Sequence, residues 1–203
     1  MEQGRLTPRK VVIIGASTGG PPIIEKILKK LPRRLKAAII IIQHLPSRYT
    51  KDFADRLRHI SPLAVHEASD GDILLPGSAV LLRGDTNFTI VKQERFSDFK
   101  YILHETTASE PRCSGCLKPN IDTTMISASK SFGKDTIAII LSGMGNDGYK
   151  GVKEIRKKGG TVIIEDSTSS VVYGMPVKVY KEKLYDYVLT PGSIAQKIIE
   201  LCS

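Results

Sequence analysis

Short runs of apolar residues recur along the chain, and most of them are rich in β-branched side chains. Four runs stand out, and they cover residues 11–14, 37–43, 136–141 and 161–165. Such nearly continuous apolar runs, without a polar residue at every second position, are typical of strands buried on both faces of a parallel sheet. The pattern therefore predicts a central sheet that is covered on both faces.

Helical patterns of apolar and polar residues lie between and after these runs. They cover residues 21–31, 51–60, 123–132, 151–159 and 193–201. Strands that alternate with helices indicate βαβ units with right-handed crossovers. We therefore expect the α/β class, with a mostly parallel, doubly wound, Rossmann-like sheet that is flanked by helices.

The middle of the chain follows another pattern. Residues 80–84, 89–94 and 100–105 are expected to be strands of a small antiparallel hairpin appended to the main sheet. A loop at 106–120, rich in Ser, Thr, Pro, Gly and Cys, is expected on the surface. Residues 1–10 are polar and basic, which predicts a terminal stub or linker remnant, and residues 11–203 are expected to form one domain.

Composition narrows the cellular setting. The longest apolar stretch, residues 37–42, is too short to cross a bilayer, and the first ten residues contain no apolar signal-peptide segment. Three cysteines in 203 residues argue against the disulfide framework of a secreted protein. We expect a cytoplasmic protein without membrane insertion.

The chain is basic, with a formal net charge of +9. A surface of this kind attracts anions, whether nucleic acid, anionic lipid or acidic protein. Only 6% of the residues are aromatic and none is Trp, which disfavours binding of single-stranded nucleic acid through stacked bases. No nucleic-acid partner is expected, and the basic residues form either solvated helix faces or a patch that binds another partner.

Three of the predicted strands end in reactive side chains. Ser17 follows the first run within GASTGG, His44 follows the second, and Asp147 follows the third within GMGNDG. Sites in open α/β sheets form at the carboxyl ends of the strands, so we expect these side chains at one edge. A hydroxyl, an imidazole and a carboxylate can then act as nucleophile, general base and base-orienting group.

Each of the three residues also has a purely structural interpretation. Ser17 fits a helix N-cap or a phosphate contact, His44 a polar loop residue, and Asp147 a turn residue that bonds its own backbone. In favour of catalysis, the glycines around Ser17 allow a sharp turn that exposes the hydroxyl. The amides of Met144 or Gly145 are suited to stabilise an oxyanion.

Four motifs in order carry a family resemblance: GASTGG, QHLP, LSGMGNDG and SSVVYGMP. They resemble the catalytic domain of the chemotaxis protein-glutamate methylesterase (CheB) family, and the resemblance extends from Val11 to the C-terminus. It implies the fold described above and a catalytic role for Ser17, His44 and Asp147. It also puts Thr18 beside the nucleophile and Met144 on the oxyanion side. We expect no cofactor and no metal.

The resemblance further implies an activity and partners. The activity is hydrolysis of glutamyl methyl esters with release of methanol, often accompanied by deamidation of receptor glutamines. The partners are the acidic cytoplasmic helices of methyl-accepting chemoreceptors. Family members usually also carry an N-terminal receiver domain, which the stretch before Val11 is too short to contain.

A CxxC pair, Cys113 and Cys116, lies in the loop at 106–120. Such a pair binds zinc when further ligands are supplied, or it forms a redox-active disulfide. His104 is near in sequence, but a fourth ligand is missing. We expect an inert surface loop, with a metal site or a disulfide as the alternatives.

Two other functions remain as alternatives. VVIIGASTGG is similar to the cofactor turn of an NAD(P)-dependent Rossmann oxidoreductase, and Tyr149 with Lys153 supplies a YxxxK pattern. The turn lacks the G-x-G-x-x-G spacing, however, and Tyr149 is expected to open a helix rather than lie midway along one. The second alternative is a non-catalytic basic binding module with the same α/β shell.

Overall fold

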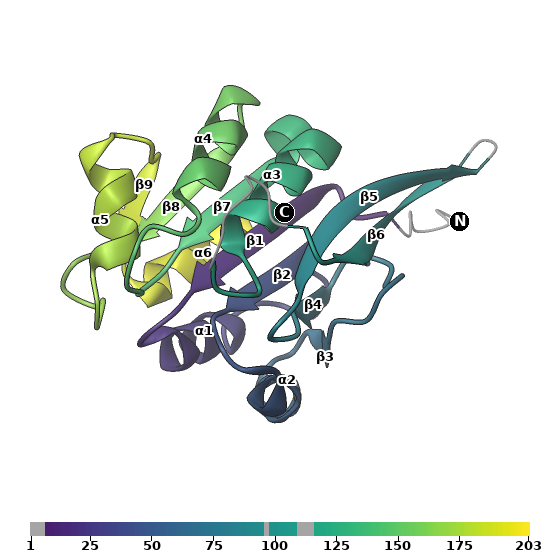
Figure 1. The fold of residues 1–203 in the computed structure, drawn as a ribbon, viewed down its shortest axis with the longest axis horizontal. Helices are drawn as coiled ribbons and strands as arrows, with labels where there is room; N and C mark the ends of the chain where they lie inside the picture. Colours follow the sequence, from purple (N-terminus) through teal and green to yellow (C-terminus); the bar gives the residue numbers. More distant parts are fainter. Residues whose placement is uncertain (1–6, 96–97, 109–115) are drawn as a thin grey trace.

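The computed structural model describes residues 7–95, 98–108 and 116–203. Its main sheet has seven strands in the order β3-β4-β2-β1-β7-β8-β9, and every pair of neighbours is parallel (Figure 1). The strands are β1 (Lys10–Ala16), β2 (Ala37–Gln43), β3 (Ala64–Glu67), β4 (Ser78–Leu81), β7 (Thr136–Ile140), β8 (Thr161–Glu165) and β9 (Tyr187–Leu189). The expected parallel, doubly wound α/β sheet is confirmed.

Helices cover both faces of this sheet, as Figure 1 shows. One face packs against α1 (Gly20–Leu28), α2 (Ser47–Ile60) and α6 (Pro191–Leu201). The other packs against α3 (Ile121–Phe132), α4 (Tyr149–Lys157) and α5 (Gly174–Lys181), and the short helix η1 (Gly133–Asp135) follows α3. The result is a three-layer sandwich with a hydrophobic core on each side of the sheet.

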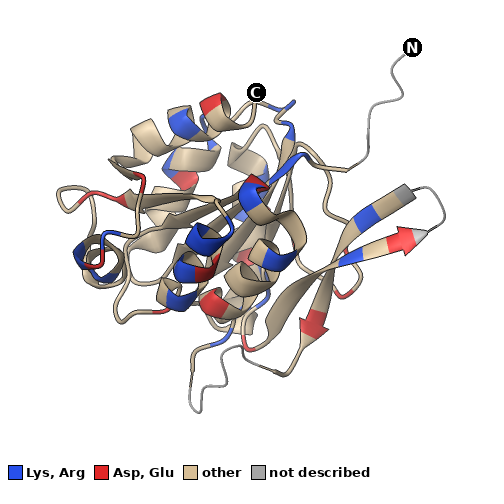
Figure 2. Cartoon of the chain, turned by 90° about the horizontal axis from the view of Figure 1, so that it is seen from above, with Lys and Arg blue, Asp and Glu red and all other residues tan. Residues whose placement is uncertain are grey.

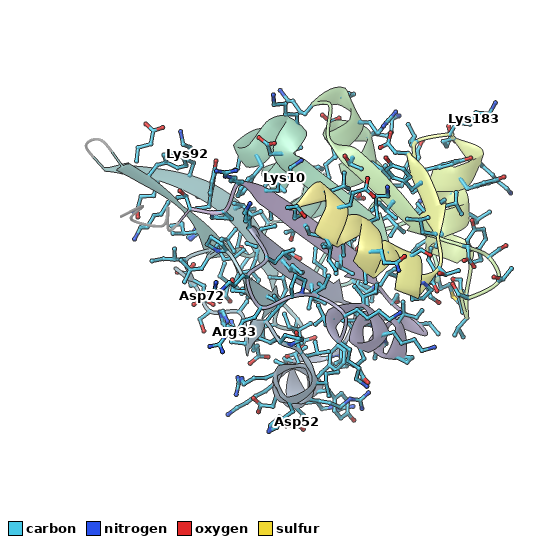
Figure 3. All side chains as sticks on the ribbon, turned by 180° about the vertical axis from the view of Figure 1, so that it is seen from behind. Lys10, Arg33, Asp52, Asp72, Lys92 and Lys183 are labelled. Carbon is cyan, nitrogen blue, oxygen red and sulfur yellow. The ribbon has the colours of Figure 1, made fainter. Side chains whose placement is uncertain are left out.

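The central strands explain the apolar runs in the sequence. Val12 and Ile14 point into the core beneath α1, whereas Val11 and Ile13 point into the core beneath α3, and all four side chains are fully buried. Successive side chains of a strand face opposite sides of the sheet, so a strand covered on both faces needs apolar residues at every position. Charged residues such as Arg33 lie at the periphery (Figure 3).

A separate two-stranded antiparallel sheet consists of β5 (Asn87–Arg95) and β6 (Asp98–Thr106). Phe88 and Leu103 join the core that contains α3, so this hairpin lies over the face of the main sheet and is not an extension of it. The prediction for residues 80–84 was wrong. They include the end of β4, a parallel strand between β2 and β3 whose residues are all buried, because the main sheet covers both of its faces.

Some elements were not expected from the sequence. The strands β3 and β9 have only four and three residues and lie at the two edges of the sheet, where short strands leave little periodicity. Helix α5 has only eight residues. Lys10 begins β1, and residues 1–6 of the expected stub lie outside the described residues. Within the described ranges, no helix combines the length and apolarity that a bilayer crossing needs.

Candidate active site

Three loops bring the predicted reactive side chains to the carboxyl edge of the sheet. Ser17 follows β1, His44 follows β2, and Asp147 lies in the loop after β7. Because β1 lies between β2 and β7, these loops are neighbours although their residues are far apart in sequence. The topology thus produces the convergence at one sheet edge that the sequence predicts.

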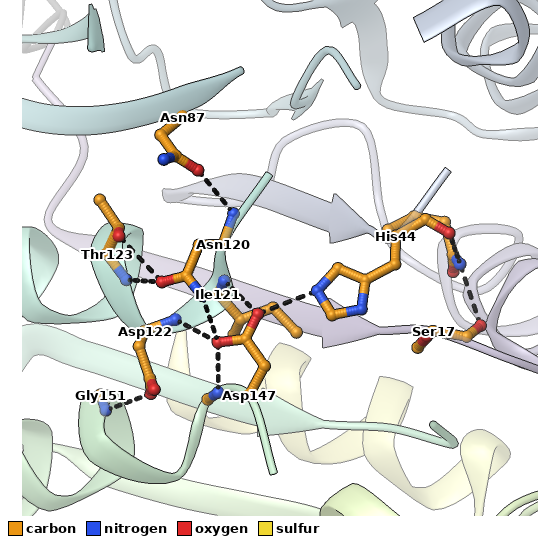
Figure 4. A network of polar contacts seen from close by, with 11 residues as sticks. Ser17, His44, Asn87, Asn120, Ile121, Asp122, Thr123, Asp147 and Gly151 are labelled. Atoms are coloured by element: carbon orange, nitrogen blue, oxygen red, sulfur yellow. Dashed lines mark hydrogen bonds and ion pairs between the residues drawn. The ribbon is translucent and has the colours of Figure 1, made fainter. Parts of the chain in front are cut away.

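The imidazole of His44 lies between Ser17 and Asp147 in Figure 4. Its Nε2 atom is 2.9 Å from Oδ2 of Asp147, and the two side chains are only 6% and 15% exposed. Ser17 and His44 line one cavity of about 460 Å³, together with Leu45, Pro46, Asp85, Cys116, Leu117 and Lys118. Within the described part of the chain, the Ser17 hydroxyl makes no hydrogen bond.

The carboxylate of Asp147 determines which nitrogen of His44 carries the proton. Asp147 also accepts hydrogen bonds from the side-chain amide of Asn120 at 3.0 Å and from the backbone amides of Ile121, Asp122 and Gly148 at 2.8, 3.0 and 2.9 Å. Since the oxygens of Asp147 accept from these four groups, Nε2 of His44 is the fifth donor to the same carboxylate. The Nδ1 atom, buried and without a protein partner among the described residues, is then the basic atom.

The N-terminus of α3 holds Asp147 in place. Two of the amides that bind the carboxylate belong to the first residues of this helix, where the N–H groups have no intrahelical partner and the helix dipole favours negative charge. Asn120 is the N-cap, and its Oδ1 accepts from the amide of Thr123 at 2.9 Å. Asp147 is therefore more than the turn residue of the structural interpretation, although it also bonds the adjacent amide of Gly148.

Gln43 holds the loop that carries Ser17 next to the loop that carries His44. The backbone carbonyl of Ser17 accepts from Nε2 of Gln43 at 2.9 Å, and the same nitrogen donates to the carbonyl of His44 at 3.2 Å. Gln43 thereby connects the two loops. The N-cap of α1 is Gly19, with φ of 83°, and no side chain caps this helix, so Ser17 is not an N-cap.

The loop after β7 approaches Ser17 from the other side. Ser142 Oγ donates to the carbonyl of Thr18 at 2.7 Å, and the buried carboxylate of Glu165 accepts from the Ser142 amide at 2.8 Å. Burial raises the pKa of Glu165, while the bonds from Ser142 and Ser169 lower it. Among the described residues, the amides of Thr18 and Met144 have no hydrogen-bond acceptor.

Asp122 is a second carboxyl group close to Asp147. Its Oδ1 accepts from the amide of Gly151 at 2.7 Å, which connects α3 to α4. Burial raises the pKa of Asp122 to about 6, the bond from Gly151 opposes this, and the charge of Asp147 adds to it. Two carboxyl groups therefore lie at this junction, of which Asp147 contacts the imidazole.

Sequence reasoning did not single out Asn120, Gln43, Ser142 or Glu165. Two of them carry a signal in the sequence. Asn120 precedes a helical pattern, as N-cap residues do, and Gln43 is a polar residue at the end of an apolar strand. The contacts of Ser142 and Glu165 depend on how β7 and β8 are paired, which the sequence alone does not specify.

The remaining candidates have other surroundings. Cys116 is disulfide-bonded and Cys113 lies outside the described residues, so a disulfide replaces the expected inert loop at Cys116. Nδ1 of His104 is 3.1 Å from Oδ1 of Asp70, and the described residues contain no group of three His, Cys, Asp or Glu side chains arranged for a metal. Tyr149 is the first residue of α4, as expected.

Comparison with known proteins shows which family this chain is similar to. A crystal structure of the Thermotoga maritima CheB methylesterase catalytic domain superposes with a TM-score of 0.84 at 38% identity, over 95% of this chain and 98% of that one. The protein-glutamate methylesterase/protein-glutamine glutaminase of Moorella thermoacetica is 39% identical over 98% of this chain, and that of Pyrococcus horikoshii is 36% identical over 95%.

The matched region is only a part of those relatives. This chain covers 46% of the length of the Moorella protein and 50% of the Pyrococcus protein, so it spans about half of the curated relatives it matches. The family model described as CheB methylesterase matches residues 12–198, which includes the main sheet except for Lys10 and Val11 of β1, and also Ser17, His44 and Asp147. The chain belongs to the CheB methylesterase family.

Proposed function

We propose that this chain is a serine-type esterase that hydrolyses glutamyl methyl esters on the cytoplasmic helices of chemoreceptors and releases methanol. The observation that carries the proposal is the His44–Asp147 hydrogen bond, which leaves the buried Nδ1 of His44 without a partner among the described residues, while Ser17 and His44 line one cavity. The curated relatives are named protein-glutamate methylesterases, which supports the choice of ester.

In the first half of the reaction, Ser17 Oγ attacks the carbonyl carbon of the ester while Nδ1 of His44 accepts the hydroxyl proton. The ionised carboxylate of Asp147 stabilises the doubly protonated imidazole. When the tetrahedral intermediate collapses, the bond to the methoxy oxygen breaks and His44 gives its proton to that oxygen. Methanol leaves, and a glutamyl ester of Ser17 remains.

In the second half, water takes the place of methanol. Nδ1 of His44 removes a proton from the water as its oxygen attacks the acyl carbon, and the proton returns to Ser17 Oγ when the acyl bond breaks. The products are a free glutamate side chain and the regenerated hydroxyl. No step requires an oxidant, a reductant or a cofactor.

The negative oxygen of each tetrahedral intermediate needs hydrogen-bond donors. The free amides of Thr18 and Met144 flank Ser17 in the loops after β1 and β7, and they are suited to this role. The loss of one such donor typically lowers turnover by roughly 10²–10³-fold. Gly145, with φ of 86°, continues the loop beyond Met144 and is a further candidate donor.

A second activity follows from the same chemistry. A glutamine side chain has an amide nitrogen where the ester has its methoxy oxygen, and protonation of that nitrogen by His44 releases ammonia. The names of the relatives include protein-glutamine glutaminase, which supports deamidation of receptor glutamines. We also expect this chain to act in the cytoplasm, with a receiver domain as a regulatory partner.

The proposal is tested with receptor membranes that carry radiolabelled methyl esters. Incubation with the chain is expected to release volatile labelled methanol, and Ser17→Ala is expected to remove nearly all of this release because no nucleophile remains. Undiminished release by Ser17→Ala, with its fold verified by circular dichroism, would contradict the proposal. The alternatives predict other outcomes, since an oxidoreductase binds NAD(P)H and a binding module keeps its function without Ser17.

A further inference from the structure

Exposed apolar side chains gather around Ser17. Met144, Val171 and Leu117 are 71%, 68% and 59% exposed, whereas the other exposed large apolar side chains of the described residues range from 38% to 48%. Folding normally buries such side chains, and a group of them next to a reactive centre indicates a surface that binds a partner. The three residues are called the apolar rim below.

The strand order puts the rim on both sides of Ser17. Met144 follows β7 and Val171 follows β8, on one side of β1. Leu117 lines the cavity together with His44, which follows β2 on the other side of β1. Val171 packs against the loop that carries Ser17, because a Cβ atom added to Gly19 in that loop would lie 2.6 Å from the Cβ of Val171.

A positive charge stands next to Leu117. Lys118 lines the same cavity, is exposed, and forms no ion pair with a residue that the structure describes. Asp85, the carboxylate on the cavity wall, is engaged elsewhere, since it accepts hydrogen bonds from the amide and the hydroxyl of Ser47 at 3.0 and 2.5 Å. Lys118 is therefore the charge available to a ligand that enters beside Leu117.

The position of the rim at the ends of strands determines the kind of partner. The backbone groups of β1, β2 and β7 are paired within the sheet, so no free strand edge is present at Ser17 for an extended peptide to join. A partner must bind through its side chains. A helix does this with its own backbone satisfied, and residues one turn before and after a central position lie on the same face.

We propose that Leu117 and Val171 are the docking contacts for a helix of the substrate protein, one on each side of the esterified glutamate. Apolar side chains one turn away from that glutamate on either side contact the rim, and an acidic side chain near it pairs with Lys118. This inference rests on the proposed function and adds to it, because it assigns the side chains of this chain that hold the substrate helix around the modified glutamate.

Binding measurements in a Ser17→Ala background test the proposal without turnover. The ligand is a helical receptor cytoplasmic fragment with glutamine at the methylation positions, and its Kd is measured by calorimetry. Leu117→Ser and Val171→Ser are each expected to raise the Kd roughly tenfold, as truncation of an apolar anchor does. Val171→Ile, which keeps the apolar contact, is expected to retain the parent affinity.

Two controls match these variants away from Ser17. Leu75 and Val91 are exposed by 39% and 41% and lie outside the rim, so Leu75→Ser and Val91→Ser are expected to leave the Kd within twofold. Lys118→Gln is expected to weaken binding at low salt and to reduce its salt dependence. Thermal unfolding of each variant verifies that the fold is intact.

The outcomes separate this inference from the proposed function. The docking inference is wrong, and the proposed function stands, if the parent chain with its Ser17 intact demethylates the receptor but the rim variants bind the fragment as well as their controls do. If the parent chain neither binds nor demethylates the receptor, both proposals fail.

Discussion

At the scale of single residues, the orientation of the His44 ring has a chemical consequence. Asp147 bonds Nε2, so in the proposed mechanism the proton acceptor is Nδ1, the reverse of the arrangement in the chymotrypsin-type triad, where Nε2 faces the serine. Five donors converge on the carboxylate of Asp147. A neutral side chain at position 147 would disturb both His44 and the N-terminus of α3, which binds the carboxylate.

Asp147→Asn is therefore expected to impair both catalysis and folding. Turnover should fall by roughly 10³–10⁴-fold, because an amide no longer selects the reactive tautomer of His44. The free energy of unfolding should fall by about 1–3 kcal/mol, because the amide NH₂ faces other donors. Esterase assays and urea unfolding measure the two effects.

The chain contains a matched control for Asp147→Asn. Asp72 also accepts from a backbone amide, that of Ser69 at 2.8 Å, and from a histidine, His66, at 3.2 Å. These residues lie away from the cavity of Ser17, so Asp72→Asn should change stability modestly and leave turnover intact. Equal losses of turnover in both variants would argue against a specific role for Asp147.

Gly19 and Gly71 allow a test of packing beside Ser17. Both have φ of 83°, but a Cβ on Gly19 would meet Val171 and Ser142, whereas a Cβ on Gly71 would meet no atom within 4 Å. Gly71→Ala should cost about 1–2 kcal/mol from backbone strain alone. Gly19→Ala should cost a further 1–3 kcal/mol, roughly, from overpacking, as measured by urea unfolding. Equal losses would refute the close contact at Gly19.

At the scale of elements, the N-terminus of α3 connects the site to the core. Its first amides bind Asp147, its N-cap Asn120 donates to the same carboxylate, and Asp122 in its first turn bonds the amide of Gly151 in α4. The angle between α3 and α4 therefore affects the position of Asp147. The raised pKa of Asp122 therefore results from its burial at the junction of α3 and α4.

Asp122→Asn is expected to change the pH dependence of stability. The folded-state pKa of about 6 lies above the ordinary value of 3.8, so the fold favours the protonated form. This contribution is complete below about pH 3.8 and is lost as the pH rises through 6. Asparagine keeps the acceptor for Gly151 without a charge, so the variant should be the more stable one at pH 7 and equal to the parent near pH 4.

Each pKa unit corresponds to about 1.4 kcal/mol, which gives an upper limit of about 3 kcal/mol for the gain at pH 7. Urea unfolding of both proteins at pH values from 4 to 8 measures it. Parallel stability profiles of the two proteins would mean that folding does not raise the pKa of Asp122.

At the scale of the whole molecule, positive charge is widely distributed. The net charge is +9, and Figure 2 shows Lys and Arg on several helices and on the two-stranded sheet. Such a field speeds the approach of acidic partners and is screened by salt within about 10 Å at 0.1 M ionic strength. It acts on encounter rates more than on the chemistry at Ser17.

The rate of receptor demethylation is accordingly expected to depend on salt. Between 50 and 500 mM NaCl, kcat/KM for receptor membranes should fall on the order of tenfold, because steering is lost. Hydrolysis of a small uncharged ester by the same chain serves as the control and should change little. A salt response that is the same for both substrates would place the effect on the enzyme itself rather than on association.

Much of this architecture follows from the sequence alone. Residues 11–14 and 37–42 are short runs rich in β-branched side chains, which favours strands, and apolar side chains at every position leave no solvent-facing side. Parallel strands then require crossovers, which brings Ser17, His44 and Asp147 to one edge. The short edge strands β3 and β9 and the helix α5 escaped prediction because few residues carry little periodicity.

What only the tertiary structure decided are the contacts between segments far apart in the chain. The strand order puts β1 between β2 and β7, the packing of α3 brings three donors to Asp147 beside His44, and the resulting geometry leaves Nδ1 without a partner among the described residues. Local sequence determines backbone preference and which faces are buried. Long-range pairing is determined by the combined packing of all layers, and that packing also left Leu117 and Val171 exposed on the two sides of Ser17.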